Sequence, residues 1–415
     1  MDFITYVYLG YTFISLYFLF LFILLYLQGK KEMLFTPLLT KKYSISFVVS
    51  CYNEESSIGK TIENLVNNGY SNLKKIIVVD DCSTDNSYNL IKEYQKKYPR
   101  LVQAVQTPKN TGNAAGAKNY GAQFVKTELI AFTDADSFPE KGSIEKMIGY
   151  FDDSEMGVVV GSILVQNRGN FLTKLQYIEY IIIKFSRKLM EFIDVIFVTP
   201  GPLVIYRKKI FDKIGGFDDK NMTEDLEITW NIISHGYKVK MNAPARVYTI
   251  APEKWKEWFN QRIRWNVGGY QAMIKYRKRY FDSGMLGFFI MPMFLLYWFI
   301  SLFGLALVGY RLLTWAISKY LSFSYSAQGN VALIALNEFS FNPDILFFFG
   351  IFLFGFSIVF TLLGYFDHKE ERKNRKGFKK PGFFIMSVYM IVYLALYPVI
   401  MVISMYRFFR KKMVW

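Results

Sequence analysis

The sequence has few of the residues that build disulfide frameworks or histidine metal centres. Cys51 and Cys82 are its two cysteines, and His235 and His368 are its two histidines, in a chain of 415 residues. Two cysteines imply no disulfide framework, and two histidines so far apart do not make a histidine metal site. These absences exclude a disulfide-stabilised secreted domain and favour a catalytic region in the cytosol.

Acidic residues are also scarce relative to basic ones: 34 Asp and Glu face 50 Lys and Arg, a net charge of +16. Such an excess is typical of proteins that contact nucleic acid, an anionic membrane face or a phosphorylated substrate. Hydrophobic residues make up 52% of the chain and charged residues 20%, too apolar for an ordinary soluble enzyme and too charged for a fully embedded chain. The composition therefore predicts partial embedding in a membrane.

Four stretches are long and apolar enough for a helix that crosses a bilayer, which takes about 20 residues. They are residues 6–27, 286–310, 345–366 and 383–406. Basic residues follow the first stretch and none precedes it, so the positive-inside rule predicts an external N-terminus and a cytoplasmic region after the helix. A cleaved signal peptide is the alternative, but a basic n-region and a small-residue cleavage site are missing.

This four-span topology conflicts with the charge rule at the last stretch. It would leave Arg407 and Arg410 outside, whereas basic residues gather on the cytoplasmic side. Either the last stretch, which Pro398 interrupts, is re-entrant, or a span is miscounted. The predicted regions are an N-terminal transmembrane helix (1–28), a cytosolic domain (29–285) and C-terminal transmembrane helices (286–415).

The cytosolic region alternates short β-branched runs with helical stretches. "SISFVVSCYNEE" and "KKIIVVDDCSTD" read as strands, with "TIENLVNNGY" as a helix between them, and "LVQAVQT", "LIAFTDAD" and "GVVVGSILV" add further strands. This pattern predicts an α/β domain with a largely parallel sheet. Ligands of such sheets bind beyond the carboxyl ends of the strands. Polar residues fall at those ends: Asn53, Glu54, Asp80, Asp81 and Asp134.

Three familiar nucleotide and calcium motifs are absent on inspection. "GKT" at 59–61 lacks the first P-loop glycine, because Glu54 stands in its place. "DDCSTDNS" lacks the glycine and the final glutamate of a calcium loop. "GNAAGAKNYG" lacks the GxGxxG spacing and remains a small-residue turn into a helix, which suits close approach to a phosphate.

Two aspartates separated by one residue end the predicted strand "LIAFTDAD". Alternate side chains of a strand point to one face, so Asp134 and Asp136 converge on one place, and their like charges favour a cation between them. Mg²⁺ or Mn²⁺ binds through one or two carboxylates together with substrate phosphate oxygens. This pair predicts a divalent-metal site beside a sugar nucleotide.

Five motifs occur in a fixed order: "VVSCYNEE", "VVDDCSTD", "AFTDADSF", "MTEDLEITW" and "QRIRW". Together they closely resemble the membrane-embedded family 2 glycosyltransferases, the group that includes cellulose, chitin, hyaluronan and bacterial poly-N-acetylglucosamine synthases. The resemblance covers residues 44–285 in its motifs and the flanking spans in arrangement only. "QRIRWNVGGY" is especially similar to the poly-N-acetylglucosamine and chitooligosaccharide synthase branch. The resemblance implies a GT-A fold, a Rossmann-like nucleotide-binding sheet.

The resemblance also implies residue roles on the donor side. Tyr52, Glu54 and Asp81 would hold the uridine. Asp134 would hold the sugar nucleotide and, with Asp136, the Mg²⁺ or Mn²⁺ ion. Lys118 is a further candidate for phosphate contact. The donor would be a UDP-sugar.

On the acceptor side, the resemblance makes Asp225 of "TED" the general base, with Glu224 beside it. Gln261, Arg264 and Trp265 would contact the diphosphate and the acceptor sugar. Proton abstraction by a placed carboxylate and neutralisation of the leaving diphosphate are the two tasks that inverting transfer requires. The alternatives are that Asp225 merely favours a helix dipole and that Arg264 and Trp265 are juxtamembrane anchors.

Two stretches, residues 171–197 and 255–280, mix apolar and basic residues and are expected to be amphipathic helices at the membrane surface. Between them, Gly201 and Pro202 predict a turn that, in this family, lies near the acceptor. We therefore expect a multi-pass enzyme of the cell membrane, with a cytoplasmic catalytic domain, that elongates a β-linked polysaccharide and translocates it. The alternatives are transfer of one sugar to a polyprenyl or sphingolipid acceptor, and an inactive transport or scaffold protein. Nucleic acid is not expected as a partner.

Overall fold

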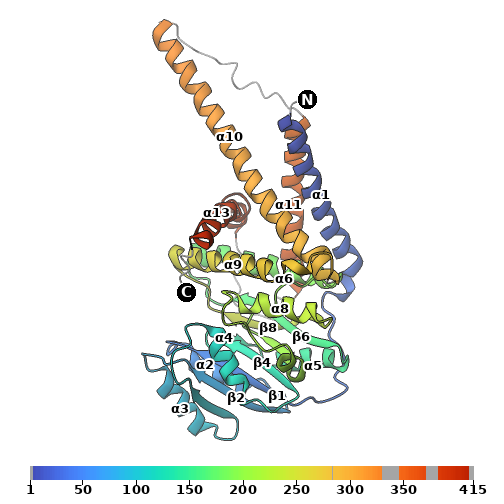
Figure 1. The fold of residues 1–415 in the computed structure, drawn as a ribbon, viewed down its shortest axis with the longest axis vertical. Coiled ribbons are helices and arrows are strands. Elements are labelled where there is room, and N and C mark those ends of the chain that lie inside the picture. The colour runs from blue at the N-terminus through green and yellow to red at the C-terminus, as the bar shows by residue number, and fades with distance from the viewer. Residues whose placement is uncertain (1–2, 283, 330–344, 371–381, 411–415) are drawn as a thin grey trace.

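The fold, a computed structural model, describes residues 3–282, 284–329, 345–370 and 382–410. It has an α/β domain from which the long helices α1 (Phe3–Gly29), α10 (Met291–Gly329) and α11 (Ile345–Glu370) project on one side (Figure 1). Two further helices, α6 (Phe171–Glu191) and α9 (Trp255–Lys275), lie between the sheet and these apolar helices.

One mixed sheet of eight strands forms the centre of the domain, in the order β3-β2-β1-β4-β7-β6-β8-β5. The strands β1 to β4 run parallel, whereas β7 is antiparallel to both of its neighbours. The parallel half therefore directs the ends of three motif-bearing strands to one edge. The bounds are β1 Ile45–Cys51, β2 Leu73–Asp80, β3 Val102–Gln106, β4 Leu129–Asp134, β5 Ser137–Pro139, β6 Met156–Val165, β7 Val204–Arg207 and β8 Lys238–Thr249.

Alternation along the strands divides the core into two layers. On β1, Phe47 and Val49 face one layer and Val48 faces the other, and all three are fully buried. The first layer packs on α2 (Ile58–Val66), α3 (Ser87–Lys97) and α5 (Ser143–Ile148). The second packs on α4 (Ala114–Ala122), α7 (Lys208–Lys213) and α8 (Glu224–Ser234). The sheet and its flanking helices predicted from the sequence are thus confirmed.

The helices α6 and α9 form where amphipathic helices were predicted, but the charged residues of α6 are mostly not at a surface. Buried charges on α6 include Glu179, Lys188 and Glu191. Lys188 Nζ donates to Glu191 Oε2 at 2.8 Å and to the carbonyl of Met241 on β8 at 3.1 Å. The sheet covers α6 on one side and apolar helices cover it on the other, and Lys188 and Glu191 pair with each other between these layers.

Among the described residues, three helices are long and apolar enough to cross a membrane: Leu9–Glu32, Leu286–Tyr325 and Phe383–Phe409. The predicted stretch 345–366 falls in α11, where Phe354–Asp367 is a shorter apolar helix. Helices α1 and α11 run side by side (Figure 1), with the rings of Phe20 and Phe356 4.8 Å apart.

The last apolar stretch is not a straight continuation of this group. It consists of α12 (Phe383–Val388), a π-helical turn at Tyr389–Tyr393 and α13 (Leu396–Phe409), and α13 lies beside α9 (Figure 1). Tyr270 of α9 donates its hydroxyl to the carbonyl of Met401 at 3.2 Å. This packing places the end of α13 next to the α/β domain.

Candidate active site

A cavity of about 1350 Å³ opens at the carboxyl ends of β1 and β4, between the sheet and the helices α6, α8 and α9. All eleven residues selected from the sequence line it, although they come from six separate parts of the chain. They are Tyr52, Glu54, Asp81, Lys118, Asp134, Asp136, Glu224, Asp225, Gln261, Arg264 and Trp265. The structure therefore brings these residues together in one cavity, and their roles stay predictions.

The end of β4 concentrates negative charge. Asp136 is half-buried, and its removal from water, followed by the nearby charges of Asp134 and Glu54, raises its pKa to about 7. Burial also raises the pKa of Glu54, whose carboxylate accepts from Ser57 Oγ at 2.6 Å. Crowded carboxylates of this kind are stabilised when a cation binds among them. No group of three or more His, Cys, Asp and Glu in metal-binding arrangement occurs within the described part of the chain.

Lys118 of α4 connects the two acidic parts of the cavity. Its Nζ lies 3.1 Å from Asp134 Oδ1 and 3.0 Å from Glu224 Oε1. Burial alone would lower the pKa of Lys118, but the two carboxylates outweigh burial and hold it well above its usual value. Gly201, in the predicted turn, leaves room for this contact, because a Cβ there would be 2.9 Å from Lys118 Nζ. Lys118 therefore forms ion pairs with two carboxylates of the cavity.

Two acids at the start of α8 have pKa values displaced in opposite directions. Burial, and then the charge of Glu224, raises the pKa of Asp225 to about 6. For Glu224, burial acts in the same direction, but the Lys118 ammonium outweighs it and the pKa of Glu224 is lowered. A carboxyl with a pKa near 6 is ionised at neutral pH yet basic enough to accept a proton, which suits a general base.

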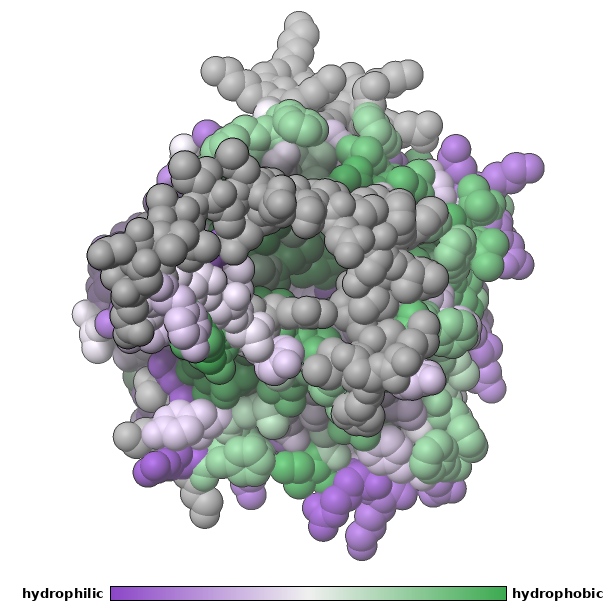
Figure 2. Space-filling view, turned by 90° about the horizontal axis from the view of Figure 1, so that it is seen from above, coloured by the Kyte–Doolittle hydropathy of each residue, from purple (hydrophilic) through white to green (hydrophobic). Residues whose placement is uncertain are grey.

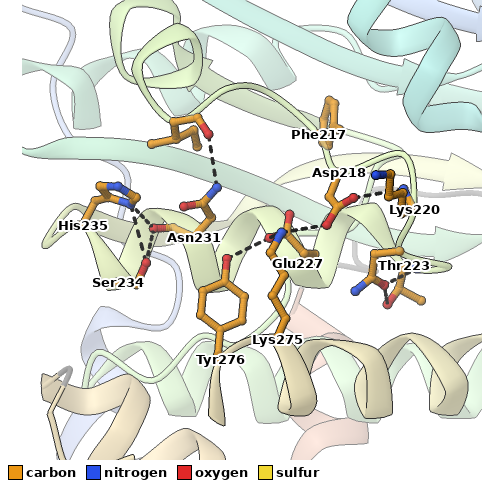
Figure 3. Close-up of polar contacts among 12 residues, drawn as sticks. Phe217, Asp218, Lys220, Thr223, Glu227, Asn231, Ser234, His235, Lys275 and Tyr276 are labelled. Atoms are coloured by element: carbon orange, nitrogen blue, oxygen red, sulfur yellow. Dashed lines mark hydrogen bonds and ion pairs between the residues drawn. The ribbon is translucent and has the colours of Figure 1, made fainter. Parts of the chain in front are cut away.

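The start of α8 is held in place by α9. Thr223 precedes Glu224, and a Cβ on Gly268 of α9 would lie 1.9 Å from Thr223 Oγ1, so only glycine allows this approach. One turn further along, buried Glu227 accepts from Lys275 Nζ at 2.6 Å and from the Tyr276 hydroxyl at 2.7 Å (Figure 3). These contacts fix the position of the catalytic candidates on α8 relative to α9.

The "QRIRW" segment lies on α9 and places two arginines in different environments. Gln261, Arg264 and Trp265 share one face of the helix by their spacing and line the cavity. Arg262, which the sequence analysis did not select, is fully buried and its Nε is 3.2 Å from Glu179 Oε1 on α6. Its Cζ lies 4.1 Å from the centroid of the Trp265 ring, so Arg262 also supports that indole.

Tyrosines from the C-terminal apolar segment complete the network around Arg262. The Tyr393 hydroxyl donates to Glu179 Oε2 at 2.7 Å and accepts from Trp258 Nε1 at 2.6 Å. Tyr397 donates to the other oxygen of Glu179 and accepts from Arg262 Nε at 3.0 Å. Because these partners are 83 and more residues apart in the chain, no local pattern in the sequence could identify them.

The residues predicted to bind the uridine differ in how many contacts they make with the rest of the protein. Asp81 accepts hydrogen bonds from Thr107 Oγ1 at 2.8 Å and from the amide and hydroxyl of Thr111 at 3.0 and 2.7 Å. It thereby fixes the loop that precedes α4. Tyr52 is 50% exposed and its ring borders the opening of the cavity.

The cavity becomes apolar toward the projecting helices. Its walls there include Phe18 and Phe22 of α1, Ile183 of α6, and Met293 and Phe294 of α10. Viewed from the side on which these helices project, the molecule has a hollow in which hydrophobic side chains are visible (Figure 2). One space therefore connects the carboxylates of the sheet edge with an apolar region.

The cavity at the sheet edge thus combines paired acids, a buried lysine and an arginine-bearing helix. Residues 46–215 match the sequence model of the family described as Glycosyl transferase family 2. The chain thus contains a family 2 glycosyltransferase domain, as the resemblance of its motifs indicated.

Curated relatives support this assignment. The chain is 31% identical over 242 residues to the probable glycosyltransferase YdaM of Bacillus subtilis, covering 57% of this chain and 58% of that protein. It is 30% identical over 236 residues to a poly-β-1,6-N-acetyl-D-glucosamine synthase of Staphylococcus aureus, covering 56% of each. The chain therefore spans just over half the length of these relatives.

A solved structure shows the same fold over nearly the whole chain. It is the mannosyltransferase PcManGT of Pyrobaculum calidifontis in complex with GDP-Man and Mn²⁺, with a TM-score of 0.58 and 13% identity. The match covers 97% of this chain and 99% of that one. The GT-A fold predicted from the motifs is thereby confirmed together with its helical region.

Proposed function

We propose that this chain transfers a hexosyl unit from a UDP-sugar to an acceptor hydroxyl, with inversion at the anomeric carbon. The observation that supports this most is Asp225, a partly buried carboxyl with a pKa raised to about 6 that lines the same cavity as the carboxylates of β4. The acceptor oxygen attacks the anomeric carbon, its proton passes to Asp225, and UDP leaves. Inversion requires that the acceptor approach the anomeric carbon opposite to the leaving group.

The residues of the β4 end fit a divalent metal ion. Asp136 and Asp134 would hold Mg²⁺ or Mn²⁺, because their crowding is relieved by a cation and hard oxygen ligands suit these ions. When bound, the ion supplies positive charge to the donor diphosphate. Arg264, whose charge lowers the pKa values of Glu224 and Asp225, would contribute a second positive charge.

For the acceptor, we propose the growing end of a β-linked polysaccharide. The relationship to a poly-β-1,6-N-acetyl-D-glucosamine synthase supports this choice. Trp265 offers an indole face for a sugar ring, and Arg262 holds that indole in place. A second candidate is a single transfer to a lipid, which the apolar walls of the cavity between α1, α6 and α10 favour.

We further propose a multi-pass membrane protein with the α/β domain in the cytoplasm. Helices α1, α10 and α11 would cross the membrane, and α13 would lie along its cytoplasmic face beside α9. The basic residues Lys30 and Lys31 at the end of α1 and Arg407 near the end of α13 would then all be cytoplasmic, in accord with the positive-inside rule.

The test is release of UDP by purified full-length protein from a panel of UDP-sugars, followed by sizing of the product. Wild type should release UDP from at least one donor, and Asp225→Asn should reduce turnover at least about 100-fold while donor affinity is kept. Asp219→Asn, which changes an exposed aspartate close by in the sequence, is the matched control. Equal turnover of the two variants would remove Asp225 as the base.

A further inference from the structure

Arg187 is a buried arginine that faces the cavity without a bonding partner. It lies on α6 and is 8% exposed. Among the described residues, no hydrogen bond or ion pair to its guanidinium is formed. The other buried cations nearby are engaged: Lys188 is bonded to Glu191, Arg262 to Glu179, and Lys118 to two carboxylates. Arg187 therefore differs from these neighbouring buried cations, each of which forms an ion pair with a carboxylate.

Burial lowers the pKa of Arg187 to about 10, while the charge of Asp225 acts in the opposite direction. The side chain thus remains cationic at neutral pH. A charged group that is buried and unpaired is strongly destabilising unless an anion or hydrogen-bond acceptor joins it. A planar guanidinium with several donors matches phosphate and carboxylate oxygens well. The guanidinium of Arg187 is therefore a candidate binding site for an anionic group in the cavity.

Arg187 shares one face of α6 with Ile183 and Met190, which stand four residues before it and three after it, and all three line the cavity. The donor side of the cavity has the carboxylates of β4 and Lys118, whereas the acid that acts on Arg187 is Asp225, the proposed base. An anion at Arg187 would thus belong to the acceptor. On this side the walls are apolar, including Ile183 and Met190 of α6 and Phe294 of α10.

We propose that Arg187 binds the phosphate of a lipid acceptor, one in which phosphate joins an apolar chain to the hydroxyl that receives the sugar. The phosphate would lie at the guanidinium and the apolar chain between α1, α6 and α10. This inference rests on the proposed sugar transfer and specifies the chemistry of its lipid candidate. A neutral polysaccharide end, the first candidate acceptor, carries no such anion, so occupation of this site distinguishes the two acceptors.

Binding to the purified full chain in detergent tests the proposal without donor and without turnover. The probes are a short isoprenoid monophosphate and the corresponding isoprenoid alcohol. Wild type should bind the phosphate at least about 10-fold more tightly, the effect of one or two charge-assisted hydrogen bonds. Arg187→Gln should lose this preference and Arg187→Lys should keep part of it. Arg277→Gln, which removes a charge outside the cavity, should keep it in full.

The outcomes separate this inference from the proposed function. Equal binding of phosphate and alcohol by wild type, or an unchanged preference in Arg187→Gln that still elutes as a folded species, would overturn the lipid-phosphate site. Competition by inorganic phosphate as strong as by the lipid phosphate would assign the site to a free anion and overturn the lipid assignment. UDP release from a UDP-sugar by wild type is measured in parallel. If release fails while the phosphate preference holds, the error lies in the proposed transfer.

Discussion

Replacing Gly268 by alanine tests whether the contact between α9 and the start of α8 sets the geometry of catalysis. The new methyl group would lie 1.9 Å from Thr223 Oγ1 and 2.7 Å from Thr223 Cβ and Cγ2. Ordinary contact begins near 3.4 Å, so the two helices must separate by about 1.5 Å unless Thr223 rotates away. Because Thr223 is followed directly by Glu224 and Asp225, this displacement moves the proposed base.

Two opposing effects determine the size of the change. Alanine in a helix is about 1 kcal/mol more favourable than glycine, whereas overpacking a tight contact costs about 1–3 kcal/mol. We expect Gly268→Ala to lower the midpoint of thermal unfolding slightly. Turnover should fall about 100-fold, since a misplacement of about 1 Å in a catalytic group has that effect. The KM for the donor should change little, because the residues proposed to hold the donor lie at the sheet edge.

The neighbouring residue provides the control. A Cβ on Gly269 would meet its nearest atom, Phe294 Cε1, at 3.7 Å, which is ordinary contact. Gly269→Ala should therefore be at least as stable as wild type and retain turnover within a few fold. The double variant Gly268→Ala with Thr223→Ala removes the atom at 1.9 Å and should recover part of the lost turnover. Equal turnover of Gly268→Ala and Gly269→Ala would refute the argument.

Four further outcomes are expected. EDTA, or Asp136→Asn, should abolish UDP release, and full activity in either would remove the metal site from β4. Since the pKa of Asp225 is raised to about 6, turnover should be constant at neutral pH and fall below about pH 6 as this base is protonated; a flat profile down to pH 4 would contradict that role. Glu179→Gln leaves the buried Arg262 charge without its carboxylate and should destabilise the chain by about 3–5 kcal/mol, as measured by thermal unfolding. As the control, Glu257→Gln breaks an exposed ion pair and should cost about 1 kcal/mol or less. Trp265→Ala should keep some donor hydrolysis and lose polymer, and a wild-type product that is one sugar on an extractable lipid would replace the polysaccharide acceptor by the lipid one.

The sheet and the donor side of the cavity could be predicted from sequence because their signals are local. Alternating apolar residues define the strands, and the motifs stand at the strand ends, so parallel pairing alone brings Glu54 and Asp134 together. The face of α9 that lines the cavity could also be predicted, since Gln261, Arg264 and Trp265 share helical spacing.

The roles of α6 and of the last apolar segment could not be predicted, because they depend on partners distant in the chain. The charges of α6 suggested a surface helix, yet Glu179 is neutralised by Arg262 and Arg187 faces the cavity. Composition gives the length of an apolar segment and not its direction. Whether Leu396–Phe409 crosses a bilayer or lies beside α9 is decided by packing on residues such as Tyr270.

The network around Glu179 has a consequence for how the protein is made. Tyr397 lines the cavity and bonds to Glu179, 218 residues earlier. A ribosome delivers the sheet, α6 and α9 first, and these can fold as they emerge. Until the tyrosines are synthesised, the carboxylate of Glu179 has Arg262 alone, and one wall of the cavity is missing. Completion of the cavity is therefore a late event in biosynthesis, so nascent chains carry all five sequence motifs before this wall of the cavity is in place.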